Sequence, residues 1–147
     1  MKKQEEKKRL SLEDFNFKGK HAAGVQMPIL LPSGQNSGEW LTVRGPECDE
    51  SQLAQREYTR LLFALEDEMA PLKAESEAKQ NFFDYNNKKS DATKELNAAF
   101  VCDVVVGWSL TEEFSKEALL NLLDGFPALM DQVSAFHGKL TTDLEAK

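Results

Sequence analysis

The chain has 147 residues, of which 18 are Lys or Arg and 25 are Asp or Glu, and its formal net charge is −7 at pH 7. Apolar residues make up 41% and charged residues 29%, which is typical of a soluble globular protein. No apolar run approaches the roughly 20 residues that a membrane-spanning helix needs, and the first residues do not lead into the apolar part of a secretory signal. These features exclude a membrane protein and predict a cytoplasmic one.

Charge is distributed unevenly along the chain. Residues 1–20 carry seven basic and four acidic side chains, whereas residues 21–147 carry 11 basic and 21 acidic ones. A body with a net charge of −10 repels phosphate backbones, so we expect no binding to nucleic acid. Glutamates interleave with the basic residues at the start, and we therefore expect residues 1–20 to be a flexible, solvated segment.

Residues 24–45 predict a β-hairpin, because two segments rich in apolar and β-forming residues flank a cluster of turn residues. Pro28 cannot donate a hydrogen bond to a neighbouring strand, so we expect the first strand to be an edge or to be broken at this point. A lone hairpin is marginal in water and must pack on the rest of the domain. Trp40 and Leu30 or Ile29 are the expected anchors.

Apolar residues recur at helical spacing after the hairpin, which predicts helices over about residues 49–138. Asp49 or Ser51 is expected to cap the first helix, and Pro71 is expected to end or kink it. The polar residues 86–90 predict a loop before the second helix.

The second helix is expected to run into Val104-Val105-Val106 and to close at Gly107-Trp108. Ser115 then predicts the N-cap of the following helix, and Pro127 the first turn of a last helix.

The sum is one domain over residues 21–140, preceded by the segment 1–20 and followed by a polar tail over residues 141–147. One domain is the expected number at this length, since domains cluster at about 100–150 residues. The predicted fold class is mainly α with a small N-terminal β-hairpin, that is, an α+β fold with a compact helical domain.

Residues that could support catalysis do not form a known motif. His21 and His137 are the only histidines, and neither lies at metal-ligand spacing from another ligand type. We expect His137 near the end of the last helix, where it favours the helix dipole. Cys48 and Cys102 predict free thiols, with Cys102 buried as a small apolar residue. We therefore expect a non-enzyme without catalytic, cofactor-binding or metal-binding residues, although a Ser-His-Asp or Cys-His assembly formed by the fold stays open.

Phe82, Phe83 and Tyr85 are aromatic residues in the most polar part of the chain. In one interpretation one or two of these rings dock the segment onto the core, which is the commoner fate of such rings. In the other, they form an exposed apolar patch that captures a partner helix. For the apolar residues Leu61, Leu65 and Met69, the pattern does not decide between a place in the core and a place in a binding groove.

Two segments form a combined pattern. The C-terminal one has an apolar stretch ending in Gly-Trp, a short loop to Phe-Ser-x-Glu, a Leu-Leu helix and a Pro-begun helix ending in Phe. Its residues are Val104 to Trp108, Phe114-Ser115-Lys116-Glu117, Leu122-Leu123, Pro127, Leu129, Val133 and Phe136. The N-terminal one is the strand Trp40-Leu41-Thr42-Val43-Arg44-Gly45. Together they resemble the tail assembly chaperones of long-tailed bacteriophages, and the residues that would determine the shared fold are Trp40, Trp108, Phe114, Ser115 and Pro127.

The resemblance implies a role in virion assembly in the host cytoplasm. Such proteins bind the long, aggregation-prone tape-measure protein, keep it soluble and promote tail-tube polymerisation, so the implied partners are the tape-measure protein and also the tail-tube protein. Many of these phages make a longer, frameshifted version. The resemblance suggests an apolar groove in which Phe82, Phe83 and Tyr85 are the candidate partner-binding residues. Self-association through the hairpin edge or a helix face is open.

Two alternatives to a chaperone remain. One is a structural tail or head–tail component retained in the virion, and the other is a small adaptor or regulator protein.

Overall fold

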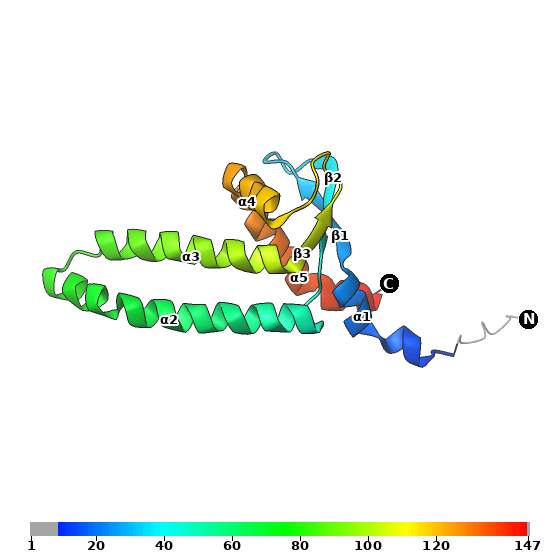
Figure 1. Cartoon of the computed structure of the whole chain (residues 1–147), viewed down its shortest axis with the longest axis horizontal. Coiled ribbons are helices and arrows are strands. Elements are labelled where there is room, and N and C mark those ends of the chain that lie inside the picture. The colour runs from blue at the N-terminus through cyan, green and yellow to red at the C-terminus, as the bar shows by residue number, and fades with distance from the viewer. Residues whose placement is uncertain (1–8, 147) are drawn as a thin grey trace, which may run out of the picture.

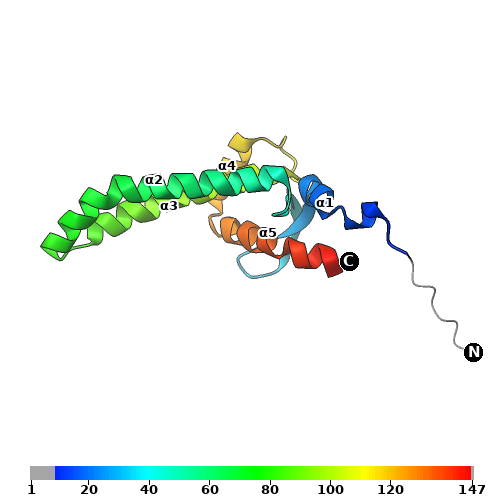
Figure 2. The ribbon, with the colours of Figure 1, turned by 90° about the horizontal axis from the view of Figure 1, so that it is seen from below.

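The computed structural model describes residues 9–146, and side chains within residues 9–140. The described part is mainly helical with one small antiparallel sheet, which confirms the predicted α+β class. A two-helix arm projects from a base that holds the sheet and the remaining helices (Figures 1 and 2). The elements are a 3-10 helix η1 (Leu12–Phe15), α1 (Phe17–Ala23), β1 (Val25–Leu30), β2 (Asn36–Val43), α2 (Asp49–Lys79), α3 (Phe83–Val104), β3 (Val105–Trp108), α4 (Lys116–Gly125) and α5 (Ala128–Ala146).

The sheet has the strand order β1-β2-β3, and β1 and β2 form the predicted hairpin. The register shifts between Pro28 and Leu30, so the ladder is irregular at the proline of an edge strand, as expected. Side chains alternate between the faces of the sheet, and Ile29 and Leu41 are buried whereas Leu30 and Trp40 are more than one-third exposed. Ile29 is thus a correct anchor, and the prediction that Trp40 or Leu30 anchors the hairpin is wrong.

The valine run forms a strand where a helix end was predicted. Helix α3 ends at Val104, and Val105 adopts extended backbone angles (φ −90°, ψ 127°). Residues of β3 pair with β2, with Trp108 opposite Leu41. The prediction that the helix continues to Gly107-Trp108 is wrong, because β-branched side chains favour the strand when a sheet edge is available.

Trp108 at the end of β3 packs against the loop that leads to α4. Its indole N–H donates to the Glu112 carbonyl (2.8 Å), and its ring meets the Phe114 ring edge-on with centroids 5.2 Å apart. Ser115 is the N-cap of α4, as predicted, since its hydroxyl oxygen accepts from the Ala118 N–H (3.0 Å). Pro127 directly precedes α5, close to its predicted position.

The core lies between the inner face of the sheet, the end of α3, and helices α4 and α5. Its members are fully or almost fully buried apolar side chains, which supply most of the hydrophobic stabilisation of the base. Among the described residues they include Met27, Leu41, Val43, Val101, Val104, Leu119, Leu123, Leu129 and Val133.

The arm consists of α2 and α3, which run antiparallel away from the base (Figure 1). The 31 residues of α2 span about 46 Å at ~1.5 Å per residue. Where the arm meets the base, the Tyr58 hydroxyl donates to the Asn97 side-chain oxygen (3.0 Å) and its ring meets the Phe100 ring edge-on. Further out, Met69 and Ser76 of α2 are buried.

Pro71 was expected to end or kink the helix near residue 70, and it lies inside α2, so the alternative that it ends the helix is wrong. A kink at this position stays a prediction. A proline removes one backbone hydrogen bond from a helix interior and commonly breaks it. Here Met69 and Ser76, on either side of the proline, are both buried, so packing of the two helices keeps both halves of α2 in place.

The turn of the arm lies at Gln80-Asn81-Phe82, and the prediction of a loop at residues 86–90 is wrong. Gln80 adopts the left-handed conformation (φ 51°), and the N–H groups of Gln80 and Asn81 donate to the carbonyls of Glu77 and Ser76. This is a Schellman helix end, which usually carries glycine. Because no glycine marks this helix end, the residue pattern does not indicate the turn. The polar residues 86–90 are exposed on α3.

The ends of the chain are more helical than expected. Residues 1–8, which make up the start of the predicted segment 1–20, lie outside the described residues, but η1 and α1 occupy most of residues 12–20. Likewise, α5 continues through Ala146, where a tail was predicted over residues 141–147. Flexibility of the first segment stays a prediction.

Buried histidines hold the connection between β2 and α2, which we call the junction (residues 44–48). The His21 ring nitrogen Nδ1 accepts from the Glu47 N–H (2.9 Å), and the His137 Nδ1 lies 2.6 Å from the Arg44 carbonyl oxygen. His21 is in α1 and fully buried, and His137 lies well inside α5. The prediction that His137 lies near the end of the last helix is therefore wrong.

Cys48 completes the junction. It is the N-cap residue of α2, where Asp49 or Ser51 was predicted. Its thiol donates to the Gly45 carbonyl and contacts the hydroxyl of the buried Ser51 (3.1 Å). Ser51 thus contacts the junction through the Cys48 thiol and does not cap the helix.

We expect Gly45→Ala to lower the free energy of unfolding by about 1–3 kcal/mol or more, because the new methyl group would overlap the His21 ring. Chemical unfolding followed by circular dichroism measures this change. Gly125→Ala is the matched control, since a methyl group there meets no other atom within 4 Å and the helix gains propensity. Equal stability of the two variants would contradict the tight packing of the junction.

We also expect stability to fall as the pH drops below 6.5. Burial lowers the pKa of His137, the hydrogen bond to the Arg44 carbonyl opposes this, and the nearby His21 adds to the lowering. The unfolded chain therefore binds more protons than the folded one below the ordinary value of 6.5, and the stabilisation is lost as the pH falls through the folded pKa. Urea unfolding from neutral pH downward measures the slope. His137→Gln, which keeps a donor but does not titrate, should flatten it, and an unchanged slope would contradict the assignment to His137.

Candidate protein-binding surfaces

The tip of the arm brings together the three aromatic residues singled out in the sequence. Phe82 and Phe83 are 41% and 70% exposed, and Tyr85 is half-buried. The rings of Phe82 and Tyr85 meet edge-on with centroids 6.4 Å apart, and the Lys89 ammonium lies over the Tyr85 ring. The tip lies at the far end of the arm from the base (Figure 1), so these rings do not dock onto the core.

The backbone of the turn holds the tip aromatics in this position. The Asn81 side-chain oxygen accepts from the Phe83 N–H (3.1 Å), and the Phe82 carbonyl accepts from the Asn86 N–H (2.8 Å). α3 therefore begins directly at the aromatic pair. Each phenylalanine therefore has one backbone group in a hydrogen bond, which limits the movement of the turn.

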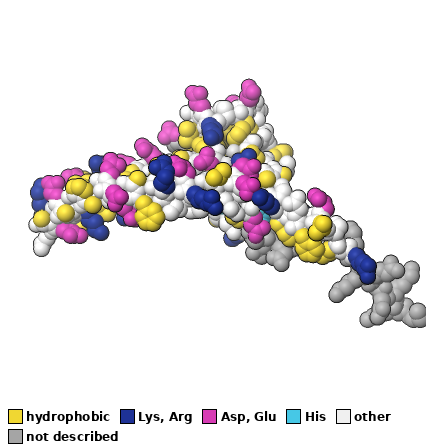
Figure 3. Space-filling model, turned by 60° about the horizontal axis from the view of Figure 1, so that its bottom comes forward, with side chains coloured by type: hydrophobic (Ala, Val, Ile, Leu, Met, Phe, Trp, Pro, Cys, Tyr) yellow, Lys and Arg dark blue, Asp and Glu magenta, His cyan; other side chains and the backbone are white. Residues whose placement is uncertain are grey.

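The side of the arm carries a further exposed aromatic residue, Phe63, which is 64% exposed on α2. The apolar pattern does not indicate Phe63, because this residue lies outside the stripe of apolar residues that recur at helical spacing. Of the residues left open there, Met69 is buried, whereas Leu61 and Leu65 are half-buried. Figure 3 shows hydrophobic side chains distributed among charged ones along the arm. A pair of helices without a third layer leaves its seam only partly covered.

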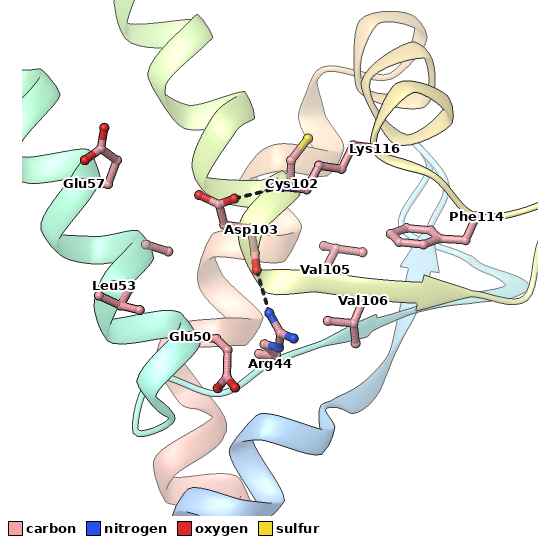
Figure 4. Close-up of a pocket in the computed structure, with 11 residues that line it drawn as sticks. Arg44, Glu50, Leu53, Glu57, Cys102, Asp103, Val105, Val106, Phe114 and Lys116 are labelled. Carbon is pink, nitrogen blue, oxygen red and sulfur yellow. Dashed lines mark hydrogen bonds and ion pairs between the residues drawn. The ribbon is translucent and has the colours of Figure 1, made fainter.

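A groove of about 610 Å³ lies between the start of α2, β3 and the start of α4, and we call it the base groove. Figure 4 shows Leu53 and Glu57 on α2 facing Val105 and Phe114 across it. The lining is Arg44, Glu50, Leu53, Ala54, Glu57, Cys102, Asp103, Val105, Val106, Phe114 and Lys116.

Charged groups surround the apolar floor of the base groove. The Lys116 ammonium pairs with the Asp103 carboxylate (3.5 Å), and Arg44 Nη1 donates to the Asp103 carbonyl oxygen (3.2 Å) (Figure 4). The Arg44 Nε atom is buried without a hydrogen-bond partner. Glu50 also lines the groove. The base groove therefore combines apolar contact area with both signs of charge.

A second groove of about 350 Å³ lies between α3, α4 and α5. Its floor is apolar, with Leu123 buried and Leu120 45% exposed, and its rim carries Lys94, Glu95 and Asp124.

The histidine and cysteine side chains of the described residues are buried. His21 and His137 bond to backbone groups of the junction. Burial raises the pKa of the Cys102 thiol, which keeps it protonated at neutral pH, and both cysteines are free and buried. Within residues 9–146, no group of three or more His, Cys, Asp or Glu side chains could hold a metal ion. The helices of this described part include none with the length and apolarity required to cross a bilayer.

Residues 49–143 match the model of a protein family described as phage tail assembly chaperone. This range covers more than half of the chain, from the first residue of α2 into α5. The chain belongs to the phage tail assembly chaperone family. The match includes the C-terminal pattern from Val104 to Phe136 and leaves out the hairpin and the N-terminal helices. No curated protein and no solved structure matches the chain significantly. The family is not a family of enzymes.

The arm of this chaperone should exchange amide hydrogens faster than its base. Residues 61–92 are packed by one neighbouring helix, whereas Leu41 and Val101 lie within the core. Local opening of the outer arm therefore exposes less apolar surface, and we expect protection to be lower there by roughly tenfold or more. Hydrogen exchange followed by mass spectrometry measures this difference. Equal protection in both regions would show that the arm and base open as one unit.

Proposed function

We propose that this phage tail assembly chaperone binds the tape-measure protein through the arm, keeps it soluble in the host cytoplasm and promotes tail-tube polymerisation around it. The observation that carries the proposal is the arm itself, a projecting pair of helices with exposed aromatic side chains at its tip and side. Phe82, Phe83 and Phe63 are the most exposed of these rings.

A third helix completes the packing of such an arm. The seam between α2 and α3 contains half-buried leucines, and a partner helix with an apolar stripe would cover them in the manner of helix-in-groove recognition. Full burial of one phenylalanine side chain contributes about 1.5–3 kcal/mol. Two or three such rings supply a binding energy suited to a transient chaperone complex, after the cost of ordering both partners.

The acidic surface fits a protein that holds apolar helices. Residues 21–147 carry a net charge of −10, which keeps a complex with exposed apolar segments in solution through mutual repulsion. The charged residues interleaved along the arm also limit self-association through its aromatic rings.

We expect the double variant Phe82→Ala/Phe83→Ala to lose most of its ability to keep co-expressed tape-measure protein soluble, because the tip aromatics no longer bury area against it. The measurement is the soluble fraction of tape-measure protein and its co-purification with the chaperone. Leu31→Ala is the matched control, as it removes an exposed apolar side chain from the hairpin of the base, outside the arm and both grooves.

Circular dichroism must show that both variants keep the helical fold. Unchanged solubilisation by the folded double variant would exclude the tip as the binding site. A tape-measure protein that never co-purifies with the unmodified chain would overturn the proposed partner.

A further inference from the structure

Helix α3 has a second exposed face, which is turned away from α2. Residues at steps of three or four share this face, and we call it the outer face of α3: Phe83, Asn87, Ser90, Asp91, Lys94 and Ala98. All of them except Ala98 are exposed. Ala92 and Leu96 are each two residues from Lys94, about 200° around the helix, and both are half-buried where α3 packs on α2. The outer face is therefore distinct from the seam between the two helices.

The outer face leads from the tip of the arm into the second groove, the one between α3, α4 and α5. Lys94 and Ala98 line this groove. Figure 1 shows α4 beside the base end of α3, on the side away from α2. Phe83 and Ala98 are 15 residues apart, which is about 22 Å at ~1.5 Å per residue. An exposed aromatic ring and an apolar groove thus lie at the two ends of one helix face.

We propose that the outer face of α3 binds a basic amphipathic helix of a partner protein. The apolar side chains of this helix contact Phe83 at one end and enter the second groove at the other, in the manner of helix-in-groove recognition. A helix of about 15–18 residues covers the distance. Asn87 and Ser90 lie between the two ends, and their short side chains leave room for a helix to lie along α3.

The second groove offers the larger apolar contact. Leu123 forms its buried floor, Leu120 is 45% exposed, and Met130 and Ala98 are half-buried. Its volume of about 350 Å³ lies within the range of roughly 300–1,000 Å³ that binding pockets show. An apolar side chain that enters removes both its own surface and that of Leu120 from water, which favours association.

Charges around the second groove select a basic partner. Asp91, Glu95 and Asp124 are exposed carboxylates on or beside its rim, whereas the lining contains one cation, Lys94. None of these three carboxylates forms an ion pair with another side chain of residues 9–140. Lysine or arginine residues that flank the apolar stripe of a partner helix would complement them, and a helix with acidic flanks would be repelled.

The position of Asp124 supports the same class of partner. This residue lies in the last turn of α4, which contains no basic residue. A carboxylate at a helix C-terminus opposes the helix dipole, and the free carbonyl groups of the last turn add negative partial charge beside it. Asp124 therefore does not stabilise its own helix. A cationic side chain of a bound partner would relieve this repulsion.

Fluorescence anisotropy with labelled synthetic peptides tests the proposal on the purified full chain. The probe is a helical peptide of about 18 residues with leucines in one stripe and lysines elsewhere. One control peptide has glutamate in place of each lysine, and another has the composition of the probe in an order that breaks the stripe. We expect the probe to bind at least about tenfold more tightly than either control, and to bind more weakly at high ionic strength.

Variants of the protein locate the bound probe. Leu120→Ser and Phe83→Ser should each weaken its binding by about tenfold or more, because each removes the apolar contact at one end. Leu31→Ser, which changes an exposed leucine of the hairpin, is the matched control and should leave binding unchanged. The double variant Glu95→Lys/Asp124→Lys should reverse the charge preference, so that the glutamate peptide binds more tightly than the lysine probe. All of these side chains are exposed, and circular dichroism verifies that the fold is kept.

Equal binding of the three peptides, or unchanged binding of the probe to the Leu120→Ser variant, would overturn the proposal. So would a groove filled by a second copy of the chain, detected by sedimentation velocity as oligomers that Leu120→Ser dissociates while the probe does not bind. The outer face is separate from the seam to which we assign tape-measure protein, and no peptide contains tape-measure sequence. A negative result here therefore leaves the proposed chaperone function to be decided by the solubility of tape-measure protein.

Discussion

The hydrogen bonds around the junction determine the direction of the arm, and the arrangement of all other surfaces depends on them. Two buried histidines from opposite ends of the chain, His21 and His137, hold its backbone. The Arg44 N–H donates to the Val104 carbonyl (2.7 Å), so the last residue of α3 is tied to the same segment that starts α2. Both roots of the arm are thereby fixed against one connection. A buried imidazole can satisfy a backbone group at a distance that short side chains cannot span.

The base and the arm differ in how extensively their side chains are packed. The base buries a continuous core under the sheet, whereas the outer arm buries one seam between two helices. The proposed binding of apolar helices requires exposed apolar area without unfolding of the protein itself. Placing this area on a projecting hairpin separates the two requirements, because changes at the tip reach the core only through the length of two helices.

Sequence patterns recovered the elements whose signals are local. The hairpin, the start near Asp49 and the Ser115 cap each depend on residues adjacent in the chain, and their predictions are confirmed. Predictions failed where distant packing decides. Pro71 is tolerated because α3 supports both sides of it, and the turn at Gln80 forms without a glycine. Likewise, the aromatic tip was identified as a candidate, but Phe63 and the base groove were not, since they follow from how α2 packs.

Pro28 affects how the outer edge of the sheet can behave toward other chains. It lies in β1 at the outer edge of the sheet, and the register is irregular beside it. A regular edge strand exposes a row of free N–H and C=O groups, to which any extended chain can add as a further strand. Proline removes one of these donors and the irregularity disturbs the spacing of the rest. Extended segments of neighbouring chains are thereby kept from growing the sheet at this edge.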